Sequence, residues 1–284
     1  MTAPKLLIMW YRRLLLRRLA VVGLDSCVGA AAMVHFDGTA EVTGVRFAEQ
    51  VAVADLCTDC TDIIVCGDAS LSSWDDSFGD LRRDHRLVPE YCRLAEKTGV
   101  RLVYISSDAV FGSPWVFHDD DCSRFSDSVI SRQLRSIEHI VLRSPQNLVI
   151  RTNAISDMKG FWLDHLRRSF RDQIPVRMSA NQYATPLADC RLALLMDHVL
   201  QTSAAGILHL AGAERLSRWK LATQLAQEES VTAPVVLPSV KQAVVEQSLR
   251  CTRARTEFQL SMPTLSQTIS DLTARTGSGS QQAA

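Results

Sequence analysis

The fold class is decided by a short stretch near the N-terminus, Val21-Val22-Gly23-Leu24-Asp25-Ser26-Cys27-Val28-Gly29. It follows an apolar run that starts at Leu19, and a helical pattern continues from it through Val34. A glycine turn between a strand and a helix is typical of nucleotide-binding units: the first glycine permits the tight turn and the last permits close helix–strand packing. Free N–H groups at the start of such a helix favour a pyrophosphate. We therefore predict cofactor contacts from Gly23, Ser26, Cys27, Val28 and Gly29.

The first two-thirds of the chain alternate short apolar runs with helical patterns, which is the signature of parallel βαβ units. Strands are expected at 19–22, 41–47, 62–66, 101–108 and 147–151, and helices at 81–97 and 128–143. Pro89 implies either a kink in its helix or a later start near Val88. The pattern predicts an α/β fold, a Rossmann-type doubly wound parallel sheet with a smaller C-terminal α/β substrate lobe.

The expected domain boundaries follow a change of pattern after Arg151. Helices are expected there at 161–172, 188–202 and 217–228, with a short strand at 206–210. The final residues are rich in Gly, Ser and Gln and cannot bury an apolar core. We expect an N-terminal extension at 1–18, a dinucleotide-binding domain at 19–152, a substrate lobe at 153–270 with interleaved segments, and a disordered tail at 271–284.

The composition argues against several classes of protein. Lys plus Arg equals Asp plus Glu at 31 each, so the net field favours neither nucleic acid nor an acidic membrane. No apolar run reaches the roughly 18–20 residues of a membrane span. The eight cysteines do not have the spacing of a disulfide framework, and Cys57-Thr-Asp-Cys60 lacks a second pair of ligands. We expect a cytoplasmic protein with no transmembrane segment and no metal site.

The strand expected at 101–108 ends in a polar stretch, Tyr104-Ile105-Ser106-Ser107-Asp108-Ala109-Val110-Phe111-Gly112. This stretch resembles the corresponding strand end of the dTDP-4-dehydrorhamnose reductases. These are extended short-chain dehydrogenases/reductases that reduce a 4-keto-sugar nucleotide with NAD(P)H. Five further segments resemble the same family in the same order, at 117–121, 137–138, 148–153, 181–186 and 206–210.

The resemblance, which spans about residues 19–262, implies roles for residues at two ligand sites. Ser107 and Asp108 fall at the reaction centre. Arg46 lies near the end of the second expected strand, where a basic residue favours NADP over NAD; the alternative is a solvated surface residue. The cofactor is therefore expected to be NADP or NAD. Further cofactor contacts are implied for Gly67, Asp68, Ala69 and Ser106, and substrate contacts for Phe111, Arg151, Asn181, Gln182 and Pro186.

The tyrosine acid of that family, and the lysine one helical turn later, are missing. Their positions fall on Ile130 and Leu134, which are both apolar. None of the four tyrosines, at 11, 91, 104 and 183, has a lysine four residues later. Loss of general acid catalysis typically costs about 10²–10⁴-fold in rate. Candidate substitute acids are Asp108, His118 and His139, although each histidine is alternatively a surface or helix-face residue.

Two residues depart from the family at the expected cofactor turns. Ser26 stands where extended reductases have a middle glycine, so it narrows the turn, although its hydroxyl could donate to a phosphate. Asp68 brings a carboxylate near the dinucleotide, which weakens binding of a phosphate-bearing ligand unless Asp68 faces solvent. The alternative to retained dinucleotide binding is a vestigial turn that binds nothing.

Three functions stay open at this point. The first is a catalytically impaired protein that binds NAD(P) or a sugar nucleotide and acts as a binding or regulatory subunit, with a protein partner or as a homo-oligomer. The second is an active NADPH-dependent reductase or epimerase of a nucleotide-linked 4-keto-sugar with a displaced acid. The third is a structural protein that binds no nucleotide.

Overall fold

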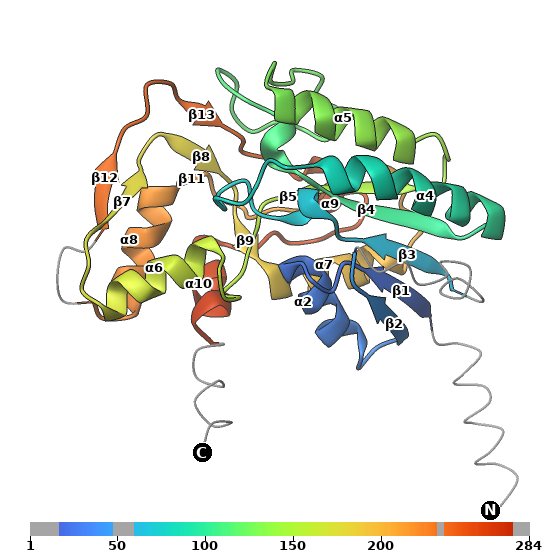
Figure 1. The fold of residues 1–284 in the computed structure, drawn as a ribbon, viewed down its shortest axis with the longest axis horizontal. Helices are drawn as coiled ribbons and strands as arrows, with labels where there is room; N and C mark the ends of the chain where they lie inside the picture. Colours follow the sequence, from blue (N-terminus) through green and yellow to red (C-terminus); the bar gives the residue numbers. More distant parts are fainter. Residues whose placement is uncertain (1–16, 48–59, 232–235, 275–284) are drawn as a thin grey trace, which may run out of the picture.

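A six-stranded parallel sheet forms the centre of the molecule, in the order β2-β1-β3-β4-β5-β10 (Figure 1). The computed structural model describes residues 17–47, 60–231 and 236–274. Inner strands such as β3 and β4 are apolar on both sides because helices cover both faces of the sheet. The predicted Rossmann-type doubly wound sheet is confirmed. Its strands are β1 (Arg18–Val22), β2 (Glu41–Val45), β3 (Asp62–Val65), β4 (Arg101–Ser107), β5 (Leu148–Thr152) and β10 (Gly206–His209).

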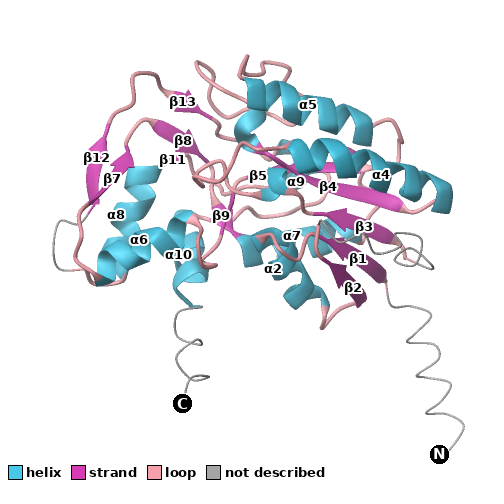
Figure 2. Cartoon of the chain, viewed as in Figure 1, coloured by secondary structure: helices cyan, strands magenta, loops and turns pink. Residues whose placement is uncertain are grey.

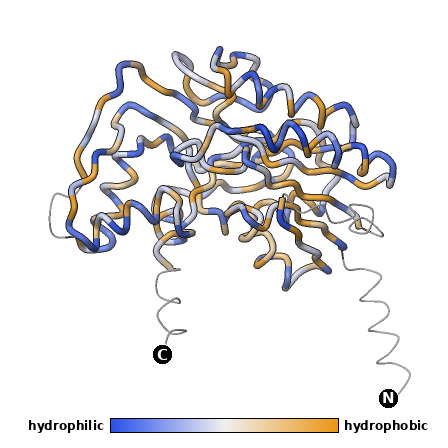
Figure 3. Tube along the Cα trace, viewed as in Figure 1, coloured by the Kyte–Doolittle hydropathy of each residue, from blue (hydrophilic) through white to orange (hydrophobic). Residues whose placement is uncertain are grey.

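Two layers of helices cover the sheet (Figure 2). Helices α4 (Arg82–Thr98) and α5 (Val129–Val141) lie on one face, and α2 (Cys27–Phe36) and α7 (Asp189–Leu200) on the other. Helix α4 buries Val88 and Tyr91, and apart from the buried Asp84 its charged residues are exposed, so hydrophilic segments mark it in Figure 3. It starts at Arg82 and continues through Pro89, so the later start considered near Val88 is wrong. It ends at Gly99, whose φ of 72° forms a left-handed cap.

A smaller lobe with its own apolar core lies beside the carboxyl ends of the central strands (Figure 1). Leu163, Leu166 and Leu225 are fully buried in that core. The chain enters the lobe after β5, returns to the sheet for α7 and β10, and then enters the lobe again. The lobe contains β7 (Val176–Ser179) paired with β12 (Val236–Ser239), β8 (Gln182–Ala184) between β11 (Leu216–Ser217) and β13 (Val245–Glu246), and the helices α6 (Trp162–Arg171), α8 (Arg218–Glu228) and α10 (Leu265–Ala274).

Short elements connect the two parts. Strands β6 (Ala154–Ile155) and β9 (Leu187–Ala188) pair in parallel, and helix α9 (Thr252–Thr256) packs against β10. Most of the expected N-terminal extension, Cys57 and the end of the expected tail lie outside the described residues. Within the described ranges, no helix is long and apolar enough to cross a membrane. The same ranges hold no group of three His, Cys, Asp or Glu residues arranged to bind a metal.

Candidate functional site

Close backbone packing fixes the turn that follows β1. Gly23 has a φ of 107°, and a Cβ atom there would lie 2.0 Å from the carbonyl oxygen of Cys66, just past β3. A Cβ atom on Gly29 would lie 2.1 Å from the carbonyl oxygen of Gly23. Both glycines are therefore needed for the turn to pack against the neighbouring strand and helix, whether or not a ligand binds.

Helix α2 begins inside the stretch that the sequence suggested as a turn, because Ser26 caps it. The Oγ of Ser26 accepts a hydrogen bond from the backbone N–H of Gly29 at 3.0 Å. The Gly29 N–H, one of the free N–H groups that could bind an anion, is thus already hydrogen-bonded within the protein. Cys27 and Val28 bury their side chains in the core, so only their backbones face the turn.

The turns after β1 and β3 meet where the strand order reverses, which is the place where doubly wound proteins bind ligands. A pocket of about 180 Å³ lies there, and we call it the crevice. Its lining includes Asp25, Ser26, Gly67 and Asp68. The fold therefore brings residues from both predicted cofactor turns into one pocket.

Other predicted cofactor residues do not line the crevice. Arg46 is exposed beyond the end of β2. Ala69 is fully buried behind the turn after β3. Ser106 is fully buried in β4, where its Oγ donates to Glu138 Oε1 at 2.6 Å.

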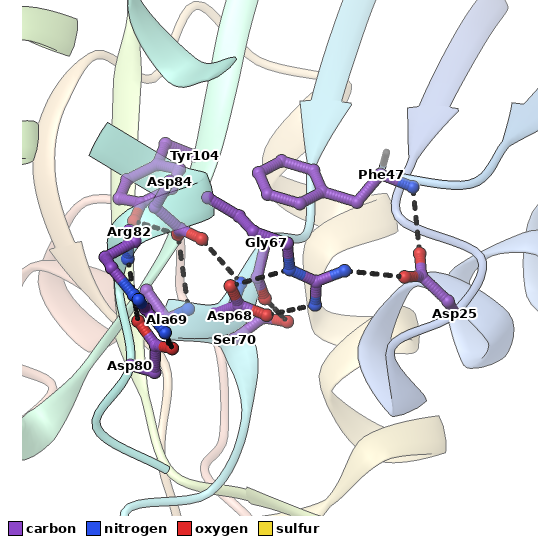
Figure 4. A network of polar contacts seen from close by, with 11 residues as sticks. Asp25, Phe47, Gly67, Asp68, Ala69, Ser70, Asp80, Arg82, Asp84 and Tyr104 are labelled. Atoms are coloured by element: carbon purple, nitrogen blue, oxygen red, sulfur yellow. Dashed lines mark hydrogen bonds and ion pairs between the residues drawn. The ribbon is translucent and has the colours of Figure 1, made fainter. Parts of the chain in front are cut away.

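Arg83, at the start of α4, joins the two turns through ion pairs. Its Nε donates to Asp68 Oδ2 at 2.9 Å, and its Nη2 pairs with the other oxygen of that carboxylate. Its Nη1 lies 3.3 Å from Asp25 Oδ2, while Asp25 Oδ1 accepts the backbone N–H of Phe47 at 2.8 Å (Figure 4). Hydrogen bonding to Asp68, together with the charge of Asp25, raises the pKa of Arg83 above its ordinary value. Sequence patterns gave no sign of this bridge.

The next residue on α4, Asp84, lies buried beneath the turn after β3. Its carboxylate accepts the backbone N–H groups of Asp68 at 2.7 Å and Ala69 at 3.2 Å, and the hydroxyl of Tyr104 at 2.7 Å (Figure 4). Burial raises the pKa of Asp84 to about 6, although these hydrogen bonds act in the opposite direction. A Cβ atom on Gly67 would lie 2.6 Å from the same carboxylate, so packing alone requires this glycine.

A dinucleotide fits the crevice poorly in the arrangement found. Its pyrophosphate would bring two negative charges into a pocket that the carboxylates of Asp25 and Asp68 already line. Arg83 supplies one positive charge against these two carboxylates. The charges in the crevice therefore oppose the ligand that the glycine turn suggests.

Ser107 and Asp108 lie at the carboxyl end of β4, and both are fully buried. The Oγ of Ser107 lies 3.2 Å from Asp108 Oδ1 and accepts the backbone N–H of Ala109 at 3.1 Å. Asp108 Oδ2 accepts a hydrogen bond from Asn153 Nδ2 at 2.9 Å. Burial raises the pKa of Asp108 to about 7, against the hydrogen bonds from Ser73, Asn153 and Ser107, which lower it.

A groove of about 380 Å³ adjoins this buried pair, between the start of α5 and β13 of the lobe. Ile130 lines it, whereas Leu134, one turn further along α5, is fully buried in the core. No described residue lining this groove is charged, and none is a tyrosine. The amide oxygen of Gln247 is buried at the groove without a hydrogen-bond partner in the described part of the chain. The lining residues are Ser73, Phe78, Ala109, Phe111, Gly112, Ser113, Ser126, Ser128, Ile130, Val244, Val245 and Gln247.

Of the predicted substrate residues, only Phe111 lines this groove. Arg151 is buried in an ion pair with Glu138. Asn181 accepts the backbone N–H of Lys241 at 2.9 Å and donates to its carbonyl at 2.8 Å. Gln182 accepts from Lys241 Nζ at 3.2 Å. Pro186 is buried, and its carbonyl packs closely against Gly212.

The three candidate substitute acids lie in different environments. His139 is exposed on α5. His118 is buried and stacks on Phe111 with ring centroids 4.2 Å apart, and burial lowers its pKa. Asp108 is therefore the candidate whose pKa is raised towards neutrality and which contacts Ser107.

The sheet, the crevice at its switch point and the lobe over the strand ends are the architecture of an extended short-chain dehydrogenase/reductase. A family model described as RmlD substrate binding domain matches residues 82–276, more than half of the chain, and the chain belongs to this family. The predicted resemblance to dTDP-4-dehydrorhamnose reductases is thereby confirmed. No curated protein shows a significant sequence match.

Solved structures with this fold include two dTDP-4-dehydrorhamnose reductases. The Bacillus anthracis enzyme in complex with NADP has a TM-score of 0.80 at 15% identity, covering 92% of this chain and 100% of the enzyme. The Clostridium acetobutylicum orthologue has a TM-score of 0.78 at 14% identity, covering 92% and 99%. MoeE5 in complex with UDP-glucuronic acid and NAD has a TM-score of 0.72 at 14% identity, covering 92% and 99%. These likenesses establish the fold.

Proposed function

We propose that this chain binds a nucleotide sugar without reducing it and acts as a binding or regulatory subunit. The observation that carries the proposal is the chemistry of the groove beside Ser107 and Asp108. Ile130, at the position where the family resemblance implies the tyrosine, lines it, and no described lining residue carries a charge. The described residues of the groove wall include serines but no tyrosine, histidine or carboxylic acid, so an alkoxide formed there by hydride transfer would lack an efficient general acid on that wall.

The groove suits the sugar part of such a ligand. Serine hydroxyls and the buried amide oxygen of Gln247 offer hydrogen bonds to sugar hydroxyls, and the half-buried Phe78 offers apolar surface. A buried acceptor without a partner carries an energetic cost that a ligand hydroxyl removes. The solved relatives that hold NADP, or NAD with UDP-glucuronic acid, support a nucleotide-linked ligand.

Calorimetric titration with dTDP-glucose and UDP-glucose, combined with an NADPH-oxidation assay on a dTDP-4-keto-sugar, tests the proposal. We expect saturable binding of a sugar nucleotide and no turnover. Gln247→Leu is expected to weaken binding about fivefold, because one hydrogen bond contributes about 1 kcal/mol. The control, Gln224→Leu, removes an exposed amide on α8 and should leave binding unchanged. Turnover at about 1–10³ s⁻¹ would overturn the proposal.

One observation favours a second candidate, an active reductase or epimerase with Asp108 as its acid. The raised pKa, about 7, leaves a substantial fraction of Asp108 protonated at neutral pH, and Asp108 contacts Ser107. Such an enzyme would need NADPH or NADH as its hydride source. If the wild-type chain turns over, this candidate predicts that Asp108→Asn lowers kcat by about 10²–10⁴-fold. If the chain shows no binding and no turnover, the result would instead favour the third function, a structural protein that binds no nucleotide.

A further inference from the structure

The crevice at the switch point is spanned by a bridge from three separate elements. Asp25 lies in the turn after β1, Asp68 in the turn after β3, and Arg83 at the start of α4. In Figure 4, Asp25 and Asp68 lie at the two ends of the dashed lines that mark these ion pairs. All three residues line the same pocket. The bridge therefore crosses the place where a dinucleotide would approach the N-terminus of α2.

A hydrogen bond from or to a neighbour holds each of the two aspartates in place. Asp25 is fixed by the backbone N–H of Phe47, which it accepts at 2.8 Å. The backbone of Asp68 is fixed by its N–H bond to the buried carboxylate of Asp84, at 2.7 Å. The guanidinium of Arg83 also lies 5.7 Å from the centre of the Phe47 ring. The packing of the two turns thus positions both aspartates, and the half-exposed Arg83 side chain pairs with the two of them.

We propose that Asp25 and Asp68 are selectivity residues that disfavour anionic ligands in the crevice. Arg83 closes the crevice by pairing with both carboxylates. A dinucleotide must separate Arg83 from at least one carboxylate before its pyrophosphate reaches the α2 N-terminus. It then faces one or both carboxylates at short range, where like charges repel. The Ser26 cap adds to this selectivity, because it occupies the N–H of Gly29.

This inference does not depend on sugar binding in the Ile130 groove, since the two pockets share no lining residue. Once both carboxylates are neutral, Arg83 becomes an unpaired cation facing the crevice, and it should attract a pyrophosphate.

Fluorescence titration of NADH and NADPH into the wild-type chain and four variants tests this inference. The double variant Asp25→Asn/Asp68→Asn keeps the side-chain shape and an acceptor for the Phe47 N–H. We expect it to bind one of the dinucleotides about tenfold or more tightly than wild type, equivalent to about 1.4 kcal/mol. Arg83→Gln leaves two unpaired carboxylates and should bind no more tightly than wild type. Asp80→Asn is the matched control, because Asp80 pairs with Arg82 on the exposed side and does not line the crevice.

Asp68→Asn alone is the fourth variant and covers the case in which the double variant does not fold, because the Asp68 carboxylate bonds to Arg83. It should bind about threefold or more tightly than wild type. Unchanged affinity in Asp68→Asn and in a folded double variant overturns the inference. So does a gain in Arg83→Gln equal to that of the double variant, because the guanidinium alone would then close the crevice. Sugar-nucleotide titrations of the same variants separate the two proposals, since groove binding should not change.

Discussion

The guanidinium of Arg151 in β5 and the carboxylate of Glu138 in α5 form a doubly hydrogen-bonded ion pair inside the protein. The Nε–Oε1 distance is 3.0 Å and the Nη2–Oε2 distance is 2.7 Å. The two side chains are only 1% and 3% exposed. The pair links α5 to the sheet and buries Arg151, for which the family resemblance implied a substrate contact; Arg151 does not line the groove.

Glu138→Ala should therefore destabilise the fold strongly. It leaves the Arg151 charge buried without its partner, and breaking a buried pair in this way costs about 3–5 kcal/mol. Urea unfolding followed by circular dichroism measures the change. Asp80→Ala, which breaks the exposed pair with Arg82, is the control and should leave the midpoint unchanged. Equal midpoints for the two variants would show that the buried pair contributes nothing.

Asp108→Asn should change how stability depends on pH. Burial raises the pKa of Asp108 from 3.8 to about 7, so between about pH 4 and 7 the folded protein binds this proton more tightly than the unfolded chain. The contribution of Asp108 to the free energy of unfolding therefore falls as pH rises through that window, by up to about 4 kcal/mol. Asparagine has no such dependence. Urea titrations should show that the free energy of unfolding of the variant, relative to wild type, is higher near pH 8 than near pH 5. The same difference between variant and wild type at both pH values would argue against the raised pKa.

Ser26→Ala should weaken the start of α2. It removes the oxygen that accepts the Gly29 N–H, and loss of such a cap costs about 0.5–2 kcal/mol. Ser26→Gly restores the glycine of the related reductases and should cost only a few tenths of a kcal/mol. Thermal unfolding of both variants measures the difference. A glycine variant less stable than the alanine variant would contradict the capping role.

Gly23→Ala should be among the most damaging small substitutions in the chain. It strains a positive φ and places Cβ 2.0 Å from the Cys66 carbonyl oxygen, so we expect a loss of about 3 kcal/mol or more. Gly38→Ala is the control, because no atom lies within 4 Å of a Cβ built there. Yield of folded protein and urea midpoints compare the two. A Gly23 variant as stable as the Gly38 variant would mean that the turn relaxes freely.

Much of the fold is local in origin and could be predicted for that reason. The runs around Ile63 and Val103 are apolar in the chain, and burial in a doubly covered sheet follows directly from that property. The positive φ of the turn at Gly23 is a local backbone requirement that glycine meets, although the close approach of Cys66 comes from the fold. Element boundaries depend on single contacts with distant residues, which the local pattern does not specify. The strand expected to reach Phe47 stops at Val45, and the Phe47 N–H is donated to Asp25.

The sequence by itself determined the fold class and the absence of any tyrosine followed four residues later by a lysine, since both are properties of the order of residues. Only the tertiary structure decided which charges meet. Arg83 pairs with Asp68 and with Asp25, 15 and 58 positions away, because the strand order places their turns together. The same folding buries Ser107, encloses Arg151 with Glu138 and turns Ile130 towards the groove. Side-chain pairing over such separations has no signature in a single sequence, because it depends on how whole elements pack.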